Sequence, residues 1–277
     1  MPEELSSLCY ITSAQLASPT DLVQLSPLAG GGPIHLAANA FRPSFDKEEG
    51  LHEVQQLMGT LLEKLGQDWQ AETIWEPSGK DWISDAQAAY DLVVLFAARD
   101  KAKYSLPVDW SMLREIEKPL LVVNPGQKRR KRSKLLAAID IANQKQQDLN
   151  EHIMDTAAQI ARVYAAELHI ITAVQVSQVA ADLDLVDPAK QETAFRQKYM
   201  ADLEQLAARH GALSEHVHVQ TGVPSDVIRK QAKKLDVIMT TVGTERRSGL
   251  SGLLFGNTVD SVLSQSPNNV LVVPRSA

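Results

Sequence analysis

The sequence predicts an α/β protein made of two tandem, doubly wound domains, each built on a five-stranded parallel sheet. A length of 277 residues suits two domains, at about 150 residues per domain. An aspartate that opens an apolar run occurs in DLVVLFAA (91–98) and again in DVIMTTV (236–242). Each is followed by another apolar run that ends in proline, KPLLVVNP (118–125) and NNVLVVP (268–274). This long period indicates two diverged copies of one fold unit.

The second copy alternates strands with helices, which indicates crossover connections and a parallel sheet. Its expected strands are continuously apolar, as strands covered on both faces should be. Apolar residues recur at helical spacing over 148–166 and 190–209, and Gly211 is a stop signal after the second helix. Pro224 opens a third helix, since proline suits a first helical turn. The expected strands are LLAAI (135–139), ELHIITAVQ (167–175), HVHVQ (216–220), DVIMTTV (236–242) and NVLVV (269–273).

The first copy follows the same plan less cleanly. A helix is expected over 50–65, where leucine, valine and methionine residues form one stripe. The stretch 17–33 is rich in serine, proline and glycine, which indicates a loop or a broken helix. The expected strands are LCYIT (8–12), IHLAANAF (34–41), WQAETIWE (69–76), DLVVLFAA (91–98) and LLVV (120–123).

A basic segment joins the two copies. NPGQKRRKRSK (124–134) combines proline, glycine and a dense run of cations between two apolar strands, as a solvated linker does. The predicted domains are therefore 1–126 and 134–277. A nucleic-acid or targeting patch is the alternative interpretation of the basic run. Since no aromatic residues interleave with the cations, we expect no nucleic-acid partner.

Composition favours a cytoplasmic protein and excludes several other classes. The net charge is −6, from 28 Lys and Arg against 34 Asp and Glu, which does not favour binding to nucleic acid or to an anionic membrane. No apolar run approaches the roughly 18 residues of a membrane span, and the first residues lack the pattern of a signal peptide. The single cysteine, Cys9, excludes a disulfide scaffold and fits a reducing compartment.

The stretch most informative about function is VGTERRSGLSGLLFGNT (242–258), between the expected fourth strand of the second copy and its last helix. Its glycines, Gly243 and Gly256 among them, let a backbone approach a ligand closely. Asn257 and Thr258 open the helix, whose N–H groups and dipole favour an anion such as phosphate. The carboxyl ends of parallel strands are also where open α/β sheets bind ligands. The spacing alone favours two interpretations of this stretch equally. One is a phosphate site, and the other is a loop that needs glycines for its own turns, with Asn257 as the helix cap.

The stretch GTERRSGLSGLLFGNT, followed by a helix and the strand NNVLVVP, resembles the carboxyl-terminal signature of the universal stress protein family. LLAAIDIAN resembles the first strand of that family, which ends in an aspartate, here Asp140, and TGVPSDVI (221–228) resembles the family's entry to its third helix. The resemblance covers 134–275 and is weaker in the first copy. It implies a Rossmann-like, five-stranded fold, a role in the stress response and, as in the nucleotide-binding members, an ATP site.

In the ATP-binding members the first-strand aspartate lies beside adenine and ribose, and a residue of the second strand meets adenine. The resemblance carries these roles to Asp140 and Val174. It likewise implies that Gly243, Gly256 and Thr258 hold ribose and phosphates. The implied ligand is ATP or AMP, and no catalytic residues are implied.

Two positions depart from the family's glycine pattern. Arg246 stands at the second glycine, where its side chain would hinder close backbone approach, although its guanidinium could bind a phosphate instead. Asn257 stands in place of a serine or threonine and can still form hydrogen bonds. The alternatives to a nucleotide site are another anionic or apolar ligand, or a non-enzymatic scaffold or sensor that binds a protein partner.

The first copy has no equivalent loop. No glycine occurs in RDKAKYSLPVDWSMLREIEK, which follows DLVVLFAA, and Thr12 or Ser13 stands where the second copy has Asp140. We therefore expect a degenerate first domain that packs on the second as an intramolecular pseudo-dimer. A homodimer or another protein is expected as a further partner.

Neither a metal site nor a catalytic site is expected. His216 and His218 alternate along one expected strand and His210 lies near a helix end, but no cysteine or carboxylate stands beside them at metal-ligand spacing. Structural or surface roles are therefore expected for the histidines. The chain has neither the Gly-x-Ser-x-Gly elbow of serine hydrolases nor a P-loop. All four tryptophans lie in the first copy, at expected core or interface positions, with an apolar ligand cleft as the alternative.

Overall fold

A computed structural model gives the fold of the chain and describes residues 7–11, 18–29, 34–41, 46–65, 69–76, 80–96, 116–126, 133–176, 186–245 and 257–275. The chain divides into two compact units, Met1–Arg129 (unit 1) and Arg130–Ala277 (unit 2). This division falls within the basic segment 124–134. The packing of the two copies as a pseudo-dimer stays a prediction.

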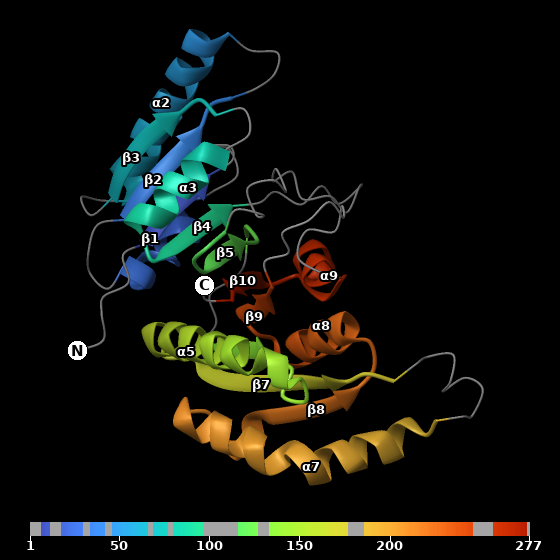
Figure 1. Cartoon of the computed structure of the whole chain (residues 1–277). Coiled ribbons are helices and arrows are strands. Elements are labelled where there is room, and N and C mark those ends of the chain that lie inside the picture. The colour runs from blue at the N-terminus through green and yellow to red at the C-terminus, as the bar shows by residue number, and fades with distance from the viewer. Residues whose placement is uncertain are drawn as a thin grey trace. The chain divides into compact units, whose positions relative to one another are not determined.

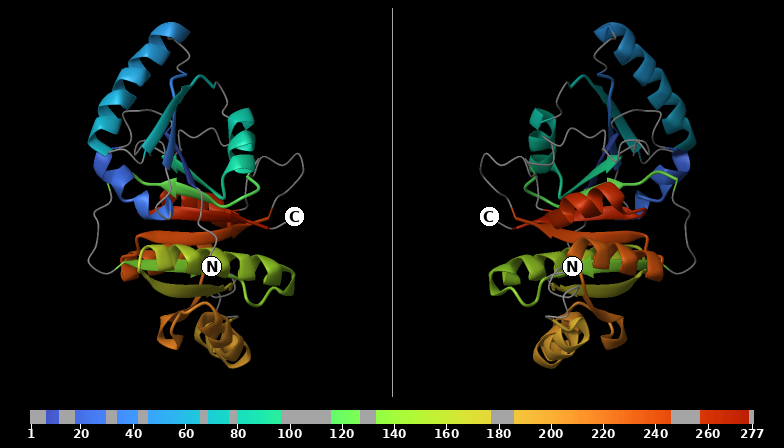
Figure 2. Two further views of the ribbon diagram at one scale, coloured as in Figure 1. Left: turned by 90° about the vertical axis from the view of Figure 1, so that its left-hand side faces the viewer. Right: turned by 90° about the vertical axis from the view of Figure 1, so that its right-hand side faces the viewer.

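Unit 1 is an α/β unit with a five-stranded parallel sheet in the order β3-β2-β1-β4-β5. Helices α2 and α3 lie on opposite sides of its strands (Figure 2). The strands are β1 (Ser7–Ile11), β2 (Ile34–Asn39), β3 (Trp69–Ile74), β4 (Leu92–Phe96) and β5 (Leu120–Val123); the helices are α1 (Pro19–Val23), the 3-10 turn η1 (Ser26–Ala29), α2 (Lys47–Leu65) and α3 (Lys80–Ala89).

Unit 2 repeats the plan with the parallel strand order β10-β9-β6-β7-β8. Figure 1 shows its long helices beside these strands. Helices α5 and α7 border a common hollow and so share one face of the sheet, while α8 packs against α9 on the other. The strands are β6 (Lys134–Ala138), β7 (Glu167–Val174), β8 (Val217–Thr221), β9 (Met239–Thr244) and β10 (Asn269–Pro274); the helices are η2 (Gln144–Gln146), α5 (Gln147–Val163), α7 (Pro188–Arg209), η3 (Ser214–His216), α8 (Pro224–Leu235) and α9 (Asn257–Gln265).

Local sequence sets the helix ends in unit 2. The carboxylate of Asp187 caps α7 by accepting from the backbone N–H of Ala189 and Lys190 at 2.9 and 3.3 Å. Pro224 occupies the first turn of α8, where its missing N–H has no cost. The same helix ends at Asp236 in the left-handed conformation, with φ at 58°.

The structure confirms all ten expected strands, with small shifts at their ends. The largest shift is at β9, which begins at Met239 although the apolar run begins at Asp236. Since Asp236 ends α8, the first residues of that run still belong to the turn that enters the strand. The helix α3 was not expected. In the stretch 17–33 the short elements α1 and η1 agree with the expected broken helix.

Two tryptophans of unit 1 pack as the sequence predicts. Trp69 is 8% exposed at the start of β3. Trp75 meets Phe41 edge to face, with ring centroids 5.5 Å apart, and its ring lies over Gly50 of α2. Trp110 and the stretch after β4 lie outside the described residues, as do Thr12 and Ser13.

Nothing in the described part of the chain has the helical length and apolar character that crossing a bilayer requires.

Candidate functional site

The carboxyl edge of the unit 2 sheet is the candidate ligand site. The chain passes from β6 to β7 and β8 on one side, then crosses back to β9 and β10 on the other. Open α/β sheets form a crevice outside the strand ends at such a switch point, here between β6 and β9. Asp140 follows β6, and Thr244 ends β9. These two residues lie at the same level, because Ala138 pairs with Val242.

The main chain of Asp140 is fixed by one buried side chain. Its N–H donates to Oδ1 of Asn150 at 3.0 Å, and its carbonyl accepts from Nδ2 of Asn150 at 2.9 Å. Asn150, on α5, is 5% exposed and so anchors this turn to the core. Partial burial raises the pKa of the Asp140 carboxyl, although hydrogen bonds from Asn143 and from the Ala142 backbone oppose the shift. The Asp140 side chain still reaches solvent at the sheet edge.

Two other predicted site residues have structural reasons for their identity. Val174, the last residue of β7, is 7% exposed, and its carbonyl accepts from the Gly222 N–H at 3.0 Å. Gly243 packs beneath α5: a Cβ there would lie 2.6 Å from Cδ1 of Ile153 and 2.9 Å from Cδ2 of Leu149. Added bulk would force these two side chains to shift, so helix packing favours glycine at this position independently of any ligand. Contact of Val174 and Gly243 with a ligand stays a prediction.

The remaining predicted residues belong to the loop that leads into α9. Thr258 is half-buried in the first turn of this helix, and Asn257 is its first residue, with a side chain outside the description. Arg246 and Gly256 also lie outside the described residues. Because α9 connects two parallel strands, its N-terminus belongs to the same edge as Asp140.

Two charged residues at this edge were missed by the sequence analysis. Glu245 directly follows β9, and Arg275 directly follows β10. Nη2 of Arg275 donates to Oε1 of Glu245 at 2.8 Å and to the Lys145 carbonyl at 2.7 Å. Nε2 of Gln146 donates to the same carboxylate oxygen at 2.8 Å. The sequence signal that could have identified Glu245 and Arg275 is their position, since each comes immediately after one of two neighbouring strands.

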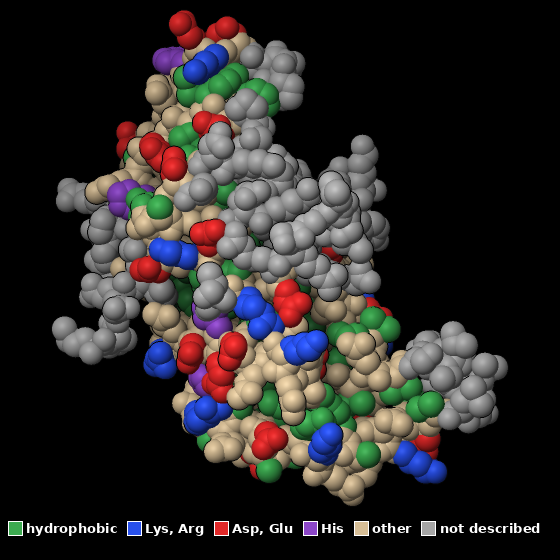
Figure 3. All heavy atoms as spheres, in the orientation of Figure 1, with side chains coloured by type: hydrophobic (Ala, Val, Ile, Leu, Met, Phe, Trp, Pro, Cys, Tyr) green, Lys and Arg blue, Asp and Glu red, His purple; other side chains and the backbone are tan. Residues whose placement is uncertain are grey.

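A hollow of about 600 Å³ adjoins the Asp140 turn. This volume lies within the range of roughly 300–1,000 Å³ found for small-molecule sites. Its walls come from residues 141–144, from Asn150 and its neighbours on α5, and from Lys198 and Tyr199 on α7. In Figure 3, acidic and basic side chains are interspersed over α5 and α7, without a large patch of one sign.

The expectation that no carboxylate stands beside the histidines is wrong. Ligand atoms of Glu167 and His169, on β7, and of His216, just before β8, lie within 4.8 Å of one another. They gather at the amino-terminal edge of the sheet, opposite to Asp140. Sequence spacing hides this cluster, because β7 and β8 are brought together only by pairing such as that of Ile170 with Val217.

The strand order of unit 2, with its switch point between β6 and β9, is that of a doubly wound α/β domain. A family model described as the universal stress protein family matches residues 131–274. Since this match covers more than half of the chain, the chain belongs to the universal stress protein family.

Relatives of known name agree with this family. The chain is 28% identical to the universal stress protein E homolog of Haemophilus influenzae over 217 residues, which are 75% of the chain and 70% of that relative. It is 28% identical to universal stress protein E of Escherichia coli K12 over 192 residues. That second match spans 66% of the chain and 60% of the Escherichia coli protein.

Solved structures agree on the fold. A protein of unknown function from Pseudomonas aeruginosa PAO1 is 26% identical, with a TM-score of 0.69 over 98% of this chain and 93% of its own. A universal stress protein from Archaeoglobus fulgidus has a TM-score of 0.63 at 18% identity, over 98% and 96% of the two chains. The predicted fold class is therefore confirmed.

Proposed function

We propose that this stress-response protein binds ATP, or a related nucleotide such as AMP, at the carboxyl edge of unit 2, without strong catalytic activity. The observation that carries the proposal is Asp140, presented at the switch point between β6 and β9 and fixed there by two hydrogen bonds to Asn150. The single cysteine of the sequence favours a reducing, cytoplasmic setting for this role.

A nucleotide fits the distribution of polar groups along this edge. The exposed carboxylate of Asp140 is a hydrogen-bond acceptor for ribose hydroxyls. On the far side of β9, the N-terminus of α9 with Thr258 supplies N–H groups and a positive dipole end for phosphates. The proposed ligand therefore spans from the Asp140 turn toward α9, with Arg246 and Gly256 assigned to its phosphates.

Calorimetric titration of the full chain with ATP, ADP and AMP tests the proposal. We expect binding of one nucleotide per chain, and an Asp140→Ala variant that binds at least tenfold more weakly, because a ribose acceptor is lost. Asp85→Ala is the matched control, since it removes an exposed carboxylate from α3 of unit 1. No binding at millimolar nucleotide, or equal affinity for Asp140→Ala and the wild type, would refute the nucleotide site.

A second candidate function is a scaffold or sensor that binds a protein partner, an apolar ligand or another anion. The ion pair of Arg275 with Glu245 favours it, because a carboxylate at the exit of β9 repels phosphate and already engages the nearby guanidinium. Mass spectrometry of small molecules released from the purified protein separates the two functions. A bound nucleotide supports the first, and an apolar species supports the second.

A further inference from the structure

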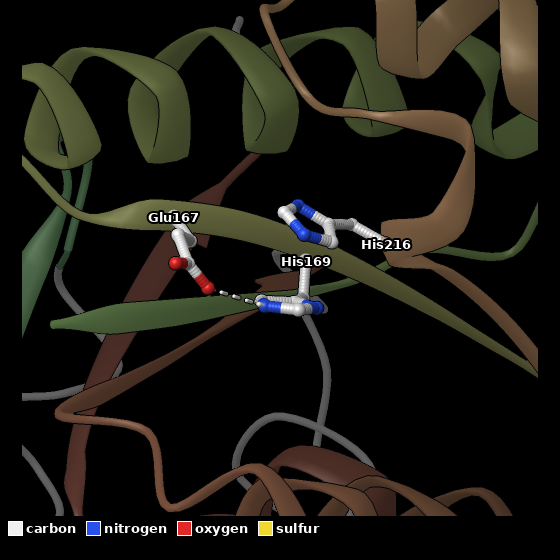
Figure 4. Close-up of side chains that lie close together, drawn as sticks. All are labelled: Glu167, His169 and His216. Carbon is white, nitrogen blue, oxygen red and sulfur yellow. Dashed lines mark ion pairs between the residues drawn. The ribbon is translucent and has the colours of Figure 1, made fainter. Parts of the chain in front are cut away.

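The geometry points to a site for a divalent transition metal, zinc or an ion of similar preference, formed by Glu167, His169 and His216. We propose this site at the amino-terminal edge of the unit 2 sheet. The proposed nucleotide belongs to the carboxyl edge, so the two sites share no residue. Figure 4 shows the carboxylate of Glu167 directed at a ring nitrogen of His169, with the ring of His216 close by.

Strand pairing brings the three side chains together. Glu167 and His169 are two residues apart on β7 and therefore point to the same face of the sheet. Because Ile170 pairs with Val217, the neighbouring residue His216 lies next to His169 on that face. The ring centroids of these two histidines are 4.0 Å apart.

One ring nitrogen in this cluster is buried and meets no hydrogen-bond partner in the part of the chain that the structure describes. It is Nε2 of His169, whose side chain is 5% exposed. A buried nitrogen in this state is costly unless it meets another polar group. The nearest acidic atom, Oε2 of Glu167, is 3.6 Å away, which is too far for a hydrogen bond.

A metal ion accounts for this separation. Bonds of about 2.0–2.1 Å to nitrogen and oxygen in a tetrahedral site hold two ligand atoms roughly 3.3 Å apart. The 3.6 Å between His169 and Glu167 is close to this value. All the ligand atoms lie within 4.8 Å of one another, so a shift of at most about 1.5 Å in a ligand atom reaches the same tetrahedral spacing. Rotation of the half-buried His216 ring can supply this shift. Two imidazoles, one carboxylate and an open fourth position form a common zinc ligand set.

His218 completes the arrangement behind the first histidine. Its Nε2 atom lies 3.1 Å from Nδ1 of His169, so that Nδ1 can donate its proton there and leave Nε2 free for a metal. Burial, followed by neighbouring charges, lowers the pKa of both histidines to about 4, so both rings are neutral near pH 7. Neutral imidazole is the form that binds metals.

The charges around the cluster are of both signs. Three positive charges oppose the binding of a cation there. Lys134, at the start of β6, acts on His169, and Lys234 and Arg196 act on His218. Glu167 and Glu215 supply negative charge, the latter 3.9 Å from Nε2 of His216. Coordination bonds to two imidazole nitrogens stabilise a bound transition metal in addition to charge attraction. This favours zinc over calcium or magnesium at this site, since those ions prefer oxygen ligands.

The test uses the full chain after removal of metal with a chelator. Calorimetric titration with zinc chloride is expected to give one ion per chain with micromolar or tighter affinity. His169→Gln and Glu167→Gln are each expected to weaken binding at least tenfold, and His52→Gln, an exposed histidine of α2, is the matched control. Circular dichroism of the metal-free variants verifies that they fold, and Glu167 is exposed enough to be replaced without disturbing the core.

Cobalt(II) gives a spectroscopic readout of the same site. A tetrahedral cobalt absorption band is expected in the wild type and should disappear in His169→Gln. His218→Gln, a positioning change, is expected to lower affinity about tenfold and to shift the cobalt band without changing the metal-free melting temperature. A protein that takes up no stoichiometric zinc, or a His169→Gln variant that binds zinc as tightly as the wild type, overturns the inference.

Discussion

Acidification should destabilise unit 2 through His169. The pKa of this histidine is lowered from 6.5 to about 4 in the folded chain, with burial as the largest cause. Between these values the unfolded chain binds a proton that the folded chain does not, so stability falls as pH decreases. The contribution is complete above pH 6.5 and is lost progressively toward pH 4. With these two pKa values, protonation of His169 alone lowers the free energy of unfolding by about 2 kcal/mol between pH 7 and pH 5.

Urea unfolding with a chelator present, followed by circular dichroism at several pH values, measures this effect. The variant His169→Gln carries no proton in this range, so its unfolding free energy should fall about 2 kcal/mol less than that of the wild type between pH 7 and pH 5. Replacing the exposed His52 of α2 by glutamine is the matched control for the loss of one histidine. If the unfolding free energies of the wild type and of His169→Gln fell by the same amount between pH 7 and pH 5, the reasoning would be refuted. His169 would then contribute nothing to the pH dependence of stability.

Three further substitutions test packing and the Asp140 turn. Gly243→Ala forces a methyl group to 2.6 Å from the Ile153 side chain and should lower the unfolding free energy of unit 2 by about 1–3 kcal/mol in urea unfolding. Asn150→Ala removes both hydrogen bonds that hold Asp140, so the free energy of unfolding should fall by about 2 kcal/mol, and calorimetry should show weaker nucleotide binding. Gly50→Ala places a methyl group 2.6 Å from an indole ring and should destabilise unit 1 by about 1–3 kcal/mol, as measured by tryptophan fluorescence.

The same helix offers the control for Gly50→Ala. A methyl group added at Gly59 of α2 would meet no atom within 4 Å, so Gly59→Ala should stabilise the helix by about 0.5–1 kcal/mol. Opposite signs for the two alanine substitutions would support a steric cause. A stabilising Gly50→Ala would contradict the contact with the indole ring, and an unchanged Gly243→Ala would mean that α5 can move away at no cost.

The central strands were predictable because a strand that is covered on both faces of a parallel sheet is apolar along its whole length. The run DLVVLFAA, for example, becomes the fully buried strand β4. Helix α3 was missed because it is short, and its described buried residues, Ile83, Ala86 and Gln87, make a weak apolar stripe. Its Gln87 is buried for a tertiary reason, since its side chain accepts from the Lys118 backbone N–H at 3.1 Å.

The candidate site was predictable only in part. Asp140 follows a recognisable strand, so its place at the carboxyl edge followed from the chain order. The pairing of Glu245 with Arg275 and the gathering of His216 beside Glu167 depend on strand register, which no local pattern encodes. The glycine at position 243 has two possible explanations, because close packing beneath α5 and close approach of a ligand both favour glycine.

Strand β7 runs from the amino-terminal edge of the unit 2 sheet, where the proposed metal site lies, to the carboxyl edge, where the proposed nucleotide site lies. It begins at Glu167 and ends at Val174, so its eight residues separate the two ends by roughly 23 Å at the usual rise of a parallel strand. Ions or ligands at the two ends are too distant for direct contact, and mobile salt screens charge beyond roughly 8 Å under physiological conditions. Occupancy of one end should therefore leave the dissociation constant at the other unchanged, and the stabilisation that each supplies against unfolding should add.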